Sequence, residues 1–385
     1  MAYFNISSTI DVTTLYNNLT PKLPLPFSGR PEYAVIAPTI WILLIIIGAI
    51  GNGLVIYTLC KNGEITATNC YIINLAIADL TFLLIVVGVT APSYAIHDWI
   101  FGDFMCKLSN YMIYVTLHAT SFTLTAMTID RYHAIVHPLS SMNWRNRKIS
   151  TITCVLVWAV SGVISVPFAL YHETDVGDNI YCQEAWPDEI LGNVIIITVT
   201  GTNYVLPLTI IVICYYQILR NLWKGYRRKQ KGRAINNAIS SDSQTRRKRR
   251  MTRMVAVIIL LFATFWFPAH VLNIYTKLYP NFPKTELMYV IKMLAHTLSY
   301  ANSCVNPFIY AFLNDRFKKS FVKTFPSMSY WFPCMRSIIE ELEHTRVTNM
   351  VDQAIQAGAD DNDNDHVEEN YNHLQMQKMQ ETSLL

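Results

Sequence analysis

The sequence predicts an all-α protein, a bundle of seven membrane-spanning helices with an amphipathic eighth helix. Hydrophobic residues make up 52% of the chain and charged residues 15%, against roughly 25% charged residues in a typical soluble domain. A helix needs about 20 mostly apolar residues to cross a bilayer. The segments that meet this requirement are Val35–Cys60, Tyr71–Ile96, Cys106–Val136, Ile149–Leu170, Ile190–Leu222, Met254–Leu278 and Leu287–Leu313.

The distribution of charge along the chain orients this bundle. Lys224–Arg253 contains twelve Lys and Arg residues and one acid, Asp242, whereas Tyr171–Glu189 contains six acids and no Lys or Arg. Cytoplasmic loops of membrane proteins carry an excess of Lys and Arg. We therefore expect a multi-pass protein of the plasma membrane with its amino terminus outside and a flexible, basic inner loop at 224–250.

Four segments follow from this topology. Residues 1–34 form a polar, proline-containing extracellular tail with glycosylation sequons at Asn5 and Asn18, and residues 35–313 form the bundle. Residues 314–326 predict an amphipathic helix on the inner membrane surface, with phenylalanines four residues apart on one face and basic residues on the other. Residues 327–385 predict an acidic, disordered cytoplasmic tail.

The cytoplasmic tail contains two further signals. Cys334 lies close to the predicted membrane surface, where reversible palmitoylation is an alternative to a plain free thiol. The final residues Ser383–Leu385 fit the pattern of a carboxyl terminus that binds a PDZ protein. We expect membrane lipid and a PDZ protein as partners on these grounds.

Only two of the eight cysteines fall on the oxidising side of the membrane under this topology. Cys106 begins the third span and Cys182 lies in the acidic outer loop. Disulfides form in oxidising compartments, so we predict a bond between these two residues. It would hold the acidic loop over the mouth of the bundle.

Asp79 is the only carboxylate near the middle of any predicted span. A lone carboxylate in lipid is costly and needs either a proton or a cation. We predict that Asp79 holds a sodium ion, with a protonated structural Asp79 as the alternative. The residues expected to share this ion are Asp79, Thr120, Asn302, Ser303 and Asn306.

Further motifs predict a bundle that can change its packing. Asp130-Arg131-Tyr132 ends the third span, where a neighbouring carboxylate can hold Arg131 until a partner's exposed helix carbonyls compete for it. Proline weakens a helix by removing a backbone donor. Three late spans each contain a proline near an aromatic or polar residue, and the pairs are Pro207 with Tyr215, Pro268 with Trp266, and Pro307 with Asn306.

These motifs resemble the rhodopsin-like (class A) G-protein-coupled receptors over about residues 35–325. The matching positions are Gly51-Asn52, Leu75–Asp79, Trp99, Cys106, Asp130–Tyr132, Trp158, Cys182, Pro207, Tyr215, Trp266, Pro268 and Asn306–Tyr310. The resemblance implies an outer ligand site, outward movement of the sixth helix and binding of a heterotrimeric G protein, with arrestin and receptor kinases as further partners. It assigns coupling and switching to Asp130, Arg131, Tyr132, Leu139, Tyr215, Trp266, Pro268, Asn306, Pro307 and Tyr310.

The sequence differs from the family pattern at two places in or next to the sixth span. Phe265 replaces the cysteine usual before this tryptophan. The basic run Arg246–Arg253 offers no acidic residue to hold Arg131, where many relatives have one. We therefore expect a looser resting state.

The resemblance also restricts the ligand. Ile113 stands where amine receptors carry Asp, and Tyr300 stands where opsins carry the retinal-binding Lys, which leaves a peptide as the best class. The acidic outer loop would attract a cationic ligand, with a plain solvated loop as the alternative. The ligand-binding residues predicted from helical position and from this loop are Ile113, Tyr114, Leu117, Glu184, His270, Asn273, Lys292, His296 and Tyr300.

Two outer segments narrow the resemblance to neuropeptide receptors. Gly102–Lys107 and Tyr181–Pro187 look like kisspeptin receptors, which implies an amidated Arg-Phe peptide and signalling through Gq. Trp186-Pro187 and Tyr132 look equally like galanin receptors. A galanin-like or allatostatin-A-like peptide with Gi coupling is therefore the alternative.

Other classes of membrane protein fit less well. A transporter or channel would show internal repeats or several charges along a path, and the chain has one central carboxylate. An intramembrane enzyme would need paired acids, a Ser–His pair or a His/Cys cluster at metal-ligand spacing, and the predicted spans show none of these at matching depth. We expect no catalytic residue, no metal other than sodium, no organic cofactor and no nucleic-acid partner.

Overall fold

The computed structural model describes residues 31–61, 66–141, 145–176, 180–231, 238–279, 283, 285–329 and 339. The expectations for Asn5, Asn18, Cys334 and Ser383–Leu385 lie outside these residues, as does almost all of the acidic tail. The chain divides between Ile309 and Tyr310 into two compact units.

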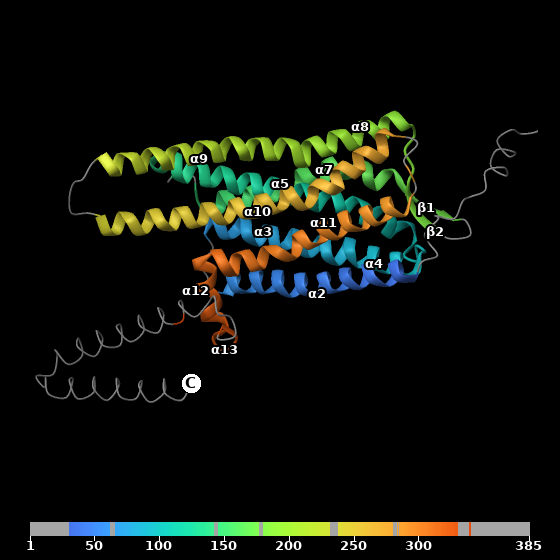
Figure 1. The fold of residues 1–385 in the computed structure, drawn as a ribbon, viewed down its shortest axis with the longest axis horizontal. Helices are drawn as coiled ribbons and strands as arrows, with labels where there is room; N and C mark the ends of the chain where they lie inside the picture. Colours follow the sequence, from blue (N-terminus) through green and yellow to red (C-terminus); the bar gives the residue numbers. More distant parts are fainter. Residues whose placement is uncertain are drawn as a thin grey trace, which may run out of the picture. The chain divides into compact units, whose positions relative to one another are not determined.

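The first unit contains long helices that lie side by side in Figure 1. The elements of its first four passes are α2 (Pro31–Lys61), α3 (Ala67–Thr81), the π-helix η1 (Phe82–Val87), α4 (Gly88–Ile96), α5 (Gly102–Val136), the short α6 (Pro138–Ser141) and α7 (Arg147–Leu170). The remaining passes are α8 (Glu189–Thr200), the π-helix η2 (Gly201–Val205), α9 (Leu206–Lys231), α10 (Ala238–Leu278) and α11 (Glu286–Leu313).

The helices coincide with the predicted spans at most of their ends. Among the described residues, six helices are long and apolar enough to cross a membrane, and α11 is not one of them. Helix α11 contains several buried polar residues, among them Asn302 and Asn306. These polar side chains face the interior of the bundle, where membrane proteins place such groups.

Three boundaries differ from the sequence-based expectation. Helix α2 begins at Pro31, inside the segment expected to be tail, because proline is favourable in the first turn of a helix. The inner loop expected at 224–250 is mostly helical, since α9 continues to Lys231 and α10 begins at Ala238. Lys, Arg and Gln are good helix formers, and the charge of the Lys and Arg residues keeps this segment outside the membrane without preventing a helix.

Helix α5 lies at the centre of the first unit. It packs against α3, α7, α9 and α10 and also contacts both strands of the outer hairpin. A polar tie joins three of the helices: Trp158 Nε1 of α7 donates to Asn74 Oδ1 of α3 at 2.9 Å, and Asn74 Nδ2 donates to Thr123 Oγ1 of α5 at 2.7 Å. Hydrogen bonds of this kind hold helices together where lipid removes the hydrophobic driving force.

The acidic outer loop folds as an antiparallel hairpin of β1 (His172–Val176) and β2 (Ile180–Glu184), which Figure 1 shows at one end of the bundle. From the sequence alone, this segment was expected only to be a loop. Asp98 fixes the hairpin to the preceding outer turn, because its Oδ1 accepts from Ile180 N at 2.7 Å. Trp99 N also donates to Ile180 O at 2.8 Å. The hairpin therefore forms a fixed cover.

The second unit contains a short amphipathic helix. Helix α12 (Asp315–Thr324) begins after Asn314, whose Oδ1 caps it by accepting from Phe317 N at 3.2 Å, and α13 (Pro326–Ser329) follows. Phe317 and Phe321 are buried, while Lys323 is exposed. The expected amphipathic eighth helix is present, and its position at the membrane surface stays a prediction.

Candidate functional site

An outer cavity opens between α5, the fifth pass and α10. Five of the nine residues predicted to bind ligand line this cavity. Its lining residues are Ile113, Tyr114, Leu117, Ile196, Val199, Thr200, Asn203, Trp266, Ala269, His270 and Asn273. None of these residues carries a carboxylate, ammonium or guanidinium group, so the cavity suits a largely apolar, uncharged group.

Five residues of this cavity were not predicted from the sequence, namely Ile196, Val199, Thr200, Asn203 and Ala269, and Asn203 is the most informative of them. Its side chain is fully buried, and neither Oδ1 nor Nδ2 has a hydrogen-bond partner among the described residues. A π-turn over Gly201–Val205 carries it, with Leu206 N donating to Gly201 O. Pro207 would clash with the Asn203 carbonyl in a regular helix, which explains the local widening. A polar residue within the fifth span was the signal that could have found it.

Two more buried polar atoms lie in the same cavity lining. Trp266 Nε1 and His270 Nε2 have no hydrogen-bond partner within the described part of the chain. Buried polar groups almost always find a partner in protein, water or ligand. We call Asn203, Trp266 and His270 the floor of the cavity. These residues offer both hydrogen-bond donors and acceptors to a ligand that occupies it.

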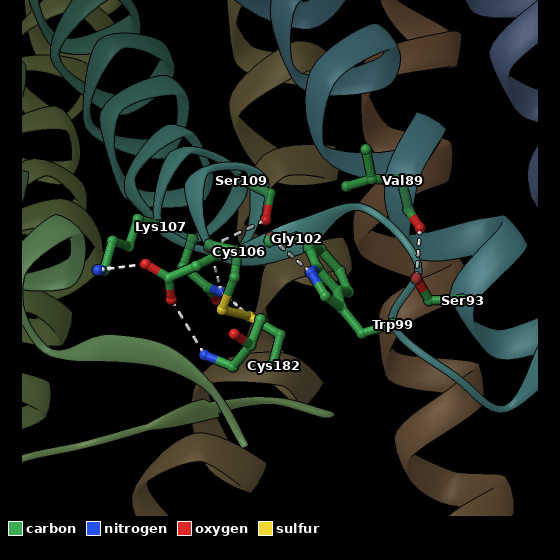
Figure 2. Close-up of a disulfide and its surroundings, with 11 residues drawn as sticks. Val89, Ser93, Trp99, Gly102, Cys106, Lys107, Ser109 and Cys182 are labelled. Atoms are coloured by element: carbon green, nitrogen blue, oxygen red, sulfur yellow. Dashed lines mark hydrogen bonds and ion pairs between the residues drawn. A yellow bond between two sulfur atoms is a disulfide. The ribbon is translucent and has the colours of Figure 1, made fainter. Parts of the chain in front are cut away.

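The hairpin is held over this end of the bundle by the predicted disulfide, which is confirmed. Cys106 of α5 and Cys182 of β2 are bonded, with their Cα atoms 5.5 Å apart (Figure 2). Asn110 Nδ2 donates to Cys182 Sγ at 3.1 Å. Trp99 packs in the same cluster as Cys106, and its Nε1 donates to Gly102 O at 2.9 Å. These contacts fix the end of α5 from which the cavity-lining residues project.

Glu184, at the end of β2, forms the charged part of this outer region. It accepts a hydrogen bond from Trp186 Nε1 at 2.6 Å and forms an ion pair with Lys277 of α10. The Glu184 and Lys277 side chains are 34% and 26% exposed, so a ligand can reach the pair. The pair joins the hairpin directly to the helix expected to move.

His172 lies close enough to this ion pair to interact electrostatically with both of its members. Its side chain is 5% exposed and packs near Phe168 and Trp186. Burial lowers the pKa of His172 below its ordinary value of 6.5, against the opposing effect of Glu184. The imidazole is therefore neutral at physiological pH.

Three other predicted ligand-binding residues do not line the cavity. Lys292 is exposed on α11, His296 is half-buried, and Tyr300 is buried. The hydroxyl of Tyr300 lies 3.4 Å from His296 Nδ1. The Tyr300 ring contacts Phe82 at 5.6 Å between centroids, and Phe82 contacts Trp266 at 5.8 Å. Tyr300 thus reaches the cavity floor only through other rings.

The predicted sodium-binding residues are all buried and come from three helices. Asp79 is 1% exposed, and its Oδ2 accepts from Asn306 Nδ2 at 2.8 Å. Asn52 Nδ2 donates to Ser303 O at 2.8 Å, while Asn52 Oδ1 is buried without a described partner. Carboxylate, hydroxyl and amide oxygens are hard ligands, so this chemistry fits an alkali cation.

The inner end of α5 contains the predicted switch. Arg131 Nη2 donates to Asp130 Oδ2 at 2.7 Å and to the hydroxyl of Thr68 on α3. Tyr132 OH lies 3.2 Å from His137 Nε2. Leu139 of α6 is 85% exposed, as a residue that contacts a partner should be.

The proline-containing helices place the remaining switch residues. Tyr215 OH of α9 donates to Thr252 O of α10 at 3.1 Å, which ties two late passes together. Pro268 and Pro307 lie inside α10 and α11. In the second unit, the buried Tyr310 has its ring centroid 6.4 Å from that of Phe317. Their roles in switching stay predictions.

Comparison with known proteins agrees with this geometry. The family model described as 7 transmembrane receptor (rhodopsin family) matches residues 51–310. Galanin receptor type 2 of Rattus norvegicus is 34% identical over 296 residues, which cover 76% of each chain. The KiSS-1 receptor of Mus musculus is 35% identical over 302 residues, covering 77% of this chain and 76% of the relative. G-protein coupled receptor 54 of Oreochromis niloticus is 37% identical over 298 residues, covering 76% and 79%.

A bundle of membrane-length helices with an outer cavity and an Asp130–Arg131 ion pair at the inner end of α5 is typical of a seven-pass membrane receptor. The chain belongs to the rhodopsin family of such receptors, in the group that contains the galanin and kisspeptin receptors. It is a multi-pass plasma-membrane protein, it is not an enzyme, and it responds to a neuropeptide by activating a G protein. These parts of the sequence-based prediction are confirmed.

Proposed function

We propose that this receptor binds a kisspeptin-like amidated neuropeptide, with the amidated end at the floor of the outer cavity, and that it activates Gq. The supporting observation is the uncharged floor, where Asn203, Trp266 and His270 present polar atoms that have no partner among the described residues. The peptide class and Gq follow from the resemblance to kisspeptin receptors.

A terminal amide fits this floor better than a free carboxylate. A carboxylate moved out of water needs a cation or several donors, and the lining residues include no Lys or Arg. A primary amide is neutral and has both donors and an acceptor. It can therefore pair with both the oxygen and the nitrogen of Asn203, while Trp266 Nε1 supplies another donor.

The hairpin supplies the complementary charge for a basic side chain of the same peptide. Glu184 is partly exposed at the outer end of the cavity region, and its present partner is Lys277. A peptide guanidinium can form a two-pronged bond with a carboxylate, which an ammonium cannot. An incoming arginine would therefore replace Lys277 and separate the hairpin from α10.

Activation then follows from contacts at the floor. Trp266 lies two residues before Pro268, so a ligand that moves the indole acts on the weakest point of α10. Outward movement of the inner end of α10 would break the bond between Tyr215 and Thr252. Arg131 would then leave Asp130 and meet the G protein.

We also propose that Asp79 holds a sodium ion in the resting state, with oxygens of Thr120, Asn302, Ser303 and Asn306 as neighbours. The ion supplies a positive charge that a buried carboxylate otherwise lacks. All five residues are buried and carry oxygen atoms, which supports this assignment.

A galanin-like peptide is the alternative ligand, since the galanin and KiSS-1 receptors are similar to this chain to nearly the same degree. The two readings differ in the chemistry of the peptide end that enters the cavity. Coupling through Gi would accompany the alternative.

The test is to express the full chain with a promiscuous Gα subunit and record calcium release. Arg-Phe-amide peptides, the same peptides as free acids, and galanin are compared in concentration series. We expect a response to the amides, and a potency at least about 100-fold lower for the free acids, because an unpaired carboxylate would be buried. A response to galanin alone, or equal potency of amide and acid, would overturn the proposal. Inositol phosphate and cyclic AMP assays with native G proteins separate Gq from Gi.

A further inference from the structure

The Asp130 carboxylate binds two arginines at once. Arg145 Nε donates to Asp130 Oδ1 at 2.7 Å, and Arg145 Nη2 donates to Oδ2 at 2.9 Å. Arg131 Nη2 donates to the same Oδ2 at 2.7 Å. Arg145 thus has the two-pronged geometry that is strongest between guanidinium and carboxylate, while Arg131 shares a single oxygen.

Arg145 comes from the inner connection between α6 and α7. Its backbone N–H donates to Ser141 O at 3.1 Å, at the end of α6. The next residue, Asn146, caps α7 by accepting from Ile149 N at 2.9 Å. The hydrogen bonds of Arg145 N and of the Asn146 side chain therefore hold Arg145 in place. Its side chain is 24% exposed and Asp130 only 6%, so the pair is largely out of water.

The other contacts of Arg131 are weak by comparison. Its second described partner is the neutral hydroxyl of Thr68, and its Nε is buried without a described partner. The resting position of Arg131 therefore depends mainly on one oxygen of Asp130. Whatever changes the charge available on Asp130 changes how readily Arg131 leaves.

We propose that Arg145 is a positioning residue for activation, which keeps Asp130 paired when Arg131 leaves and thereby makes the release of Arg131 easier. Without Arg145, the departure of Arg131 would leave a nearly buried carboxylate without a cation, which is strongly unfavourable. With Arg145 in place, Asp130 keeps two charged hydrogen bonds in both states. The two guanidinium groups also repel each other across the shared carboxylate.

The inference rests on the role proposed above for Arg131. It assigns the loose resting state expected from the sequence to a specific residue outside the Asp-Arg-Tyr motif. The inner connection between α6 and α7 thus becomes part of the switch.

The test measures agonist-free GTPγS binding in membranes that contain the full-length receptor and a promiscuous G protein, normalised to surface expression. Arg145→Gln should lower basal nucleotide exchange at least about threefold, because Asp130 then binds Arg131 alone. Arg147→Gln is the matched control. Arg147 is exposed two residues further on, it forms no ion pair within the described part of the chain, and its replacement should leave basal exchange unchanged.

The same change in an Asp130→Asn background separates positioning from other roles. There, Arg145→Gln should have no effect, since the charge that it acts through is gone. An equal loss in both backgrounds would mean that Arg145 contacts the G protein or only orders the connection, and would overturn the inference. Unchanged or increased exchange for Arg145→Gln in the native background would do the same.

Arg131→Ala tests the proposed role of Arg131 independently. Retained exchange in this variant would remove the assumption on which the inference rests. Loss of exchange in Arg131→Ala together with unchanged exchange in Arg145→Gln would remove the inference and leave the proposed function standing.

Discussion

Replacement of Asn203 with leucine should stabilise the ligand-free receptor and weaken its response to peptide. Leucine has nearly the shape of asparagine and needs no hydrogen-bond partner. Asn203 is fully buried, and both polar atoms of its side chain lack a partner among the described residues. A buried polar group without a partner costs about 1–3 kcal/mol.

The magnitude of each effect follows from that cost. If water at the cavity floor compensates part of it, Asn203→Leu raises the free energy of unfolding by about 1 kcal/mol, which is a melting-temperature increase of about 2 °C. The amidated peptide end loses the partner for its own amide. That loss is worth about 1.5–3 kcal/mol, or roughly a 10- to 100-fold lower potency.

The assay is thermal unfolding of the purified receptor without ligand, together with calcium release in response to the most potent peptide of the screen. Thr209→Val is the control, since Thr209 lies on the same pass and is exposed, and its hydroxyl bonds no described residue other than Val205, one turn earlier. It should change neither quantity beyond experimental error. A lower melting temperature with unchanged potency for Asn203→Leu would show that Asn203 is a structural residue, and the assignment of the cavity floor would fail.

Three further predictions concern the outer cover. Glu184→Gln should lower the potency of an arginine-containing peptide, while Lys277→Gln should raise that potency about threefold because it frees Glu184. Concentration series of the peptide measure both potencies. Equal shifts in the same direction would contradict a competition between Lys277 and the peptide arginine for Glu184. Cys182→Ser should lower the free energy of unfolding by about 4 kcal/mol, because the bond to Cys106 closes a long loop, and unchanged thermal stability would refute this. The free energy of unfolding of the native receptor should fall as pH drops below 6.5, because buried His172 resists a proton that the unfolded chain accepts. Unfolding measured from pH 7.5 to 5.5 tests this, and His172→Gln should make the free energy of unfolding less dependent on pH.

The sequence alone determined the passes of the chain. Apolar length is a local property, because each span must satisfy its own backbone in lipid. It therefore located α5, α7 and α11 to within a few residues at each end. Apolar length does not detect polar helices outside the membrane, so the extension of α10 back to Ala238 was not predicted.

The disulfide was also predictable from the sequence. Topology left Cys106 and Cys182 as the two cysteines on the oxidising side, and no distance was needed to pair them. The hairpin around Cys182 was not predictable in this way. Its strands depend on Asp98, which accepts a hydrogen bond from Ile180 across a long stretch of chain.

Which polar residues meet was decided only by the tertiary structure. Five residues named from helical position line the cavity, but Asn203 faces it because a π-turn before Pro207 shifts the register of the fifth pass. Arg145 reaches Asp130 from a position next to the short helix α6, where its backbone N–H donates to Ser141 O. Hydrophobicity is summed along one segment, whereas a hydrogen bond needs two segments at about 3 Å, and only packing fixes that distance.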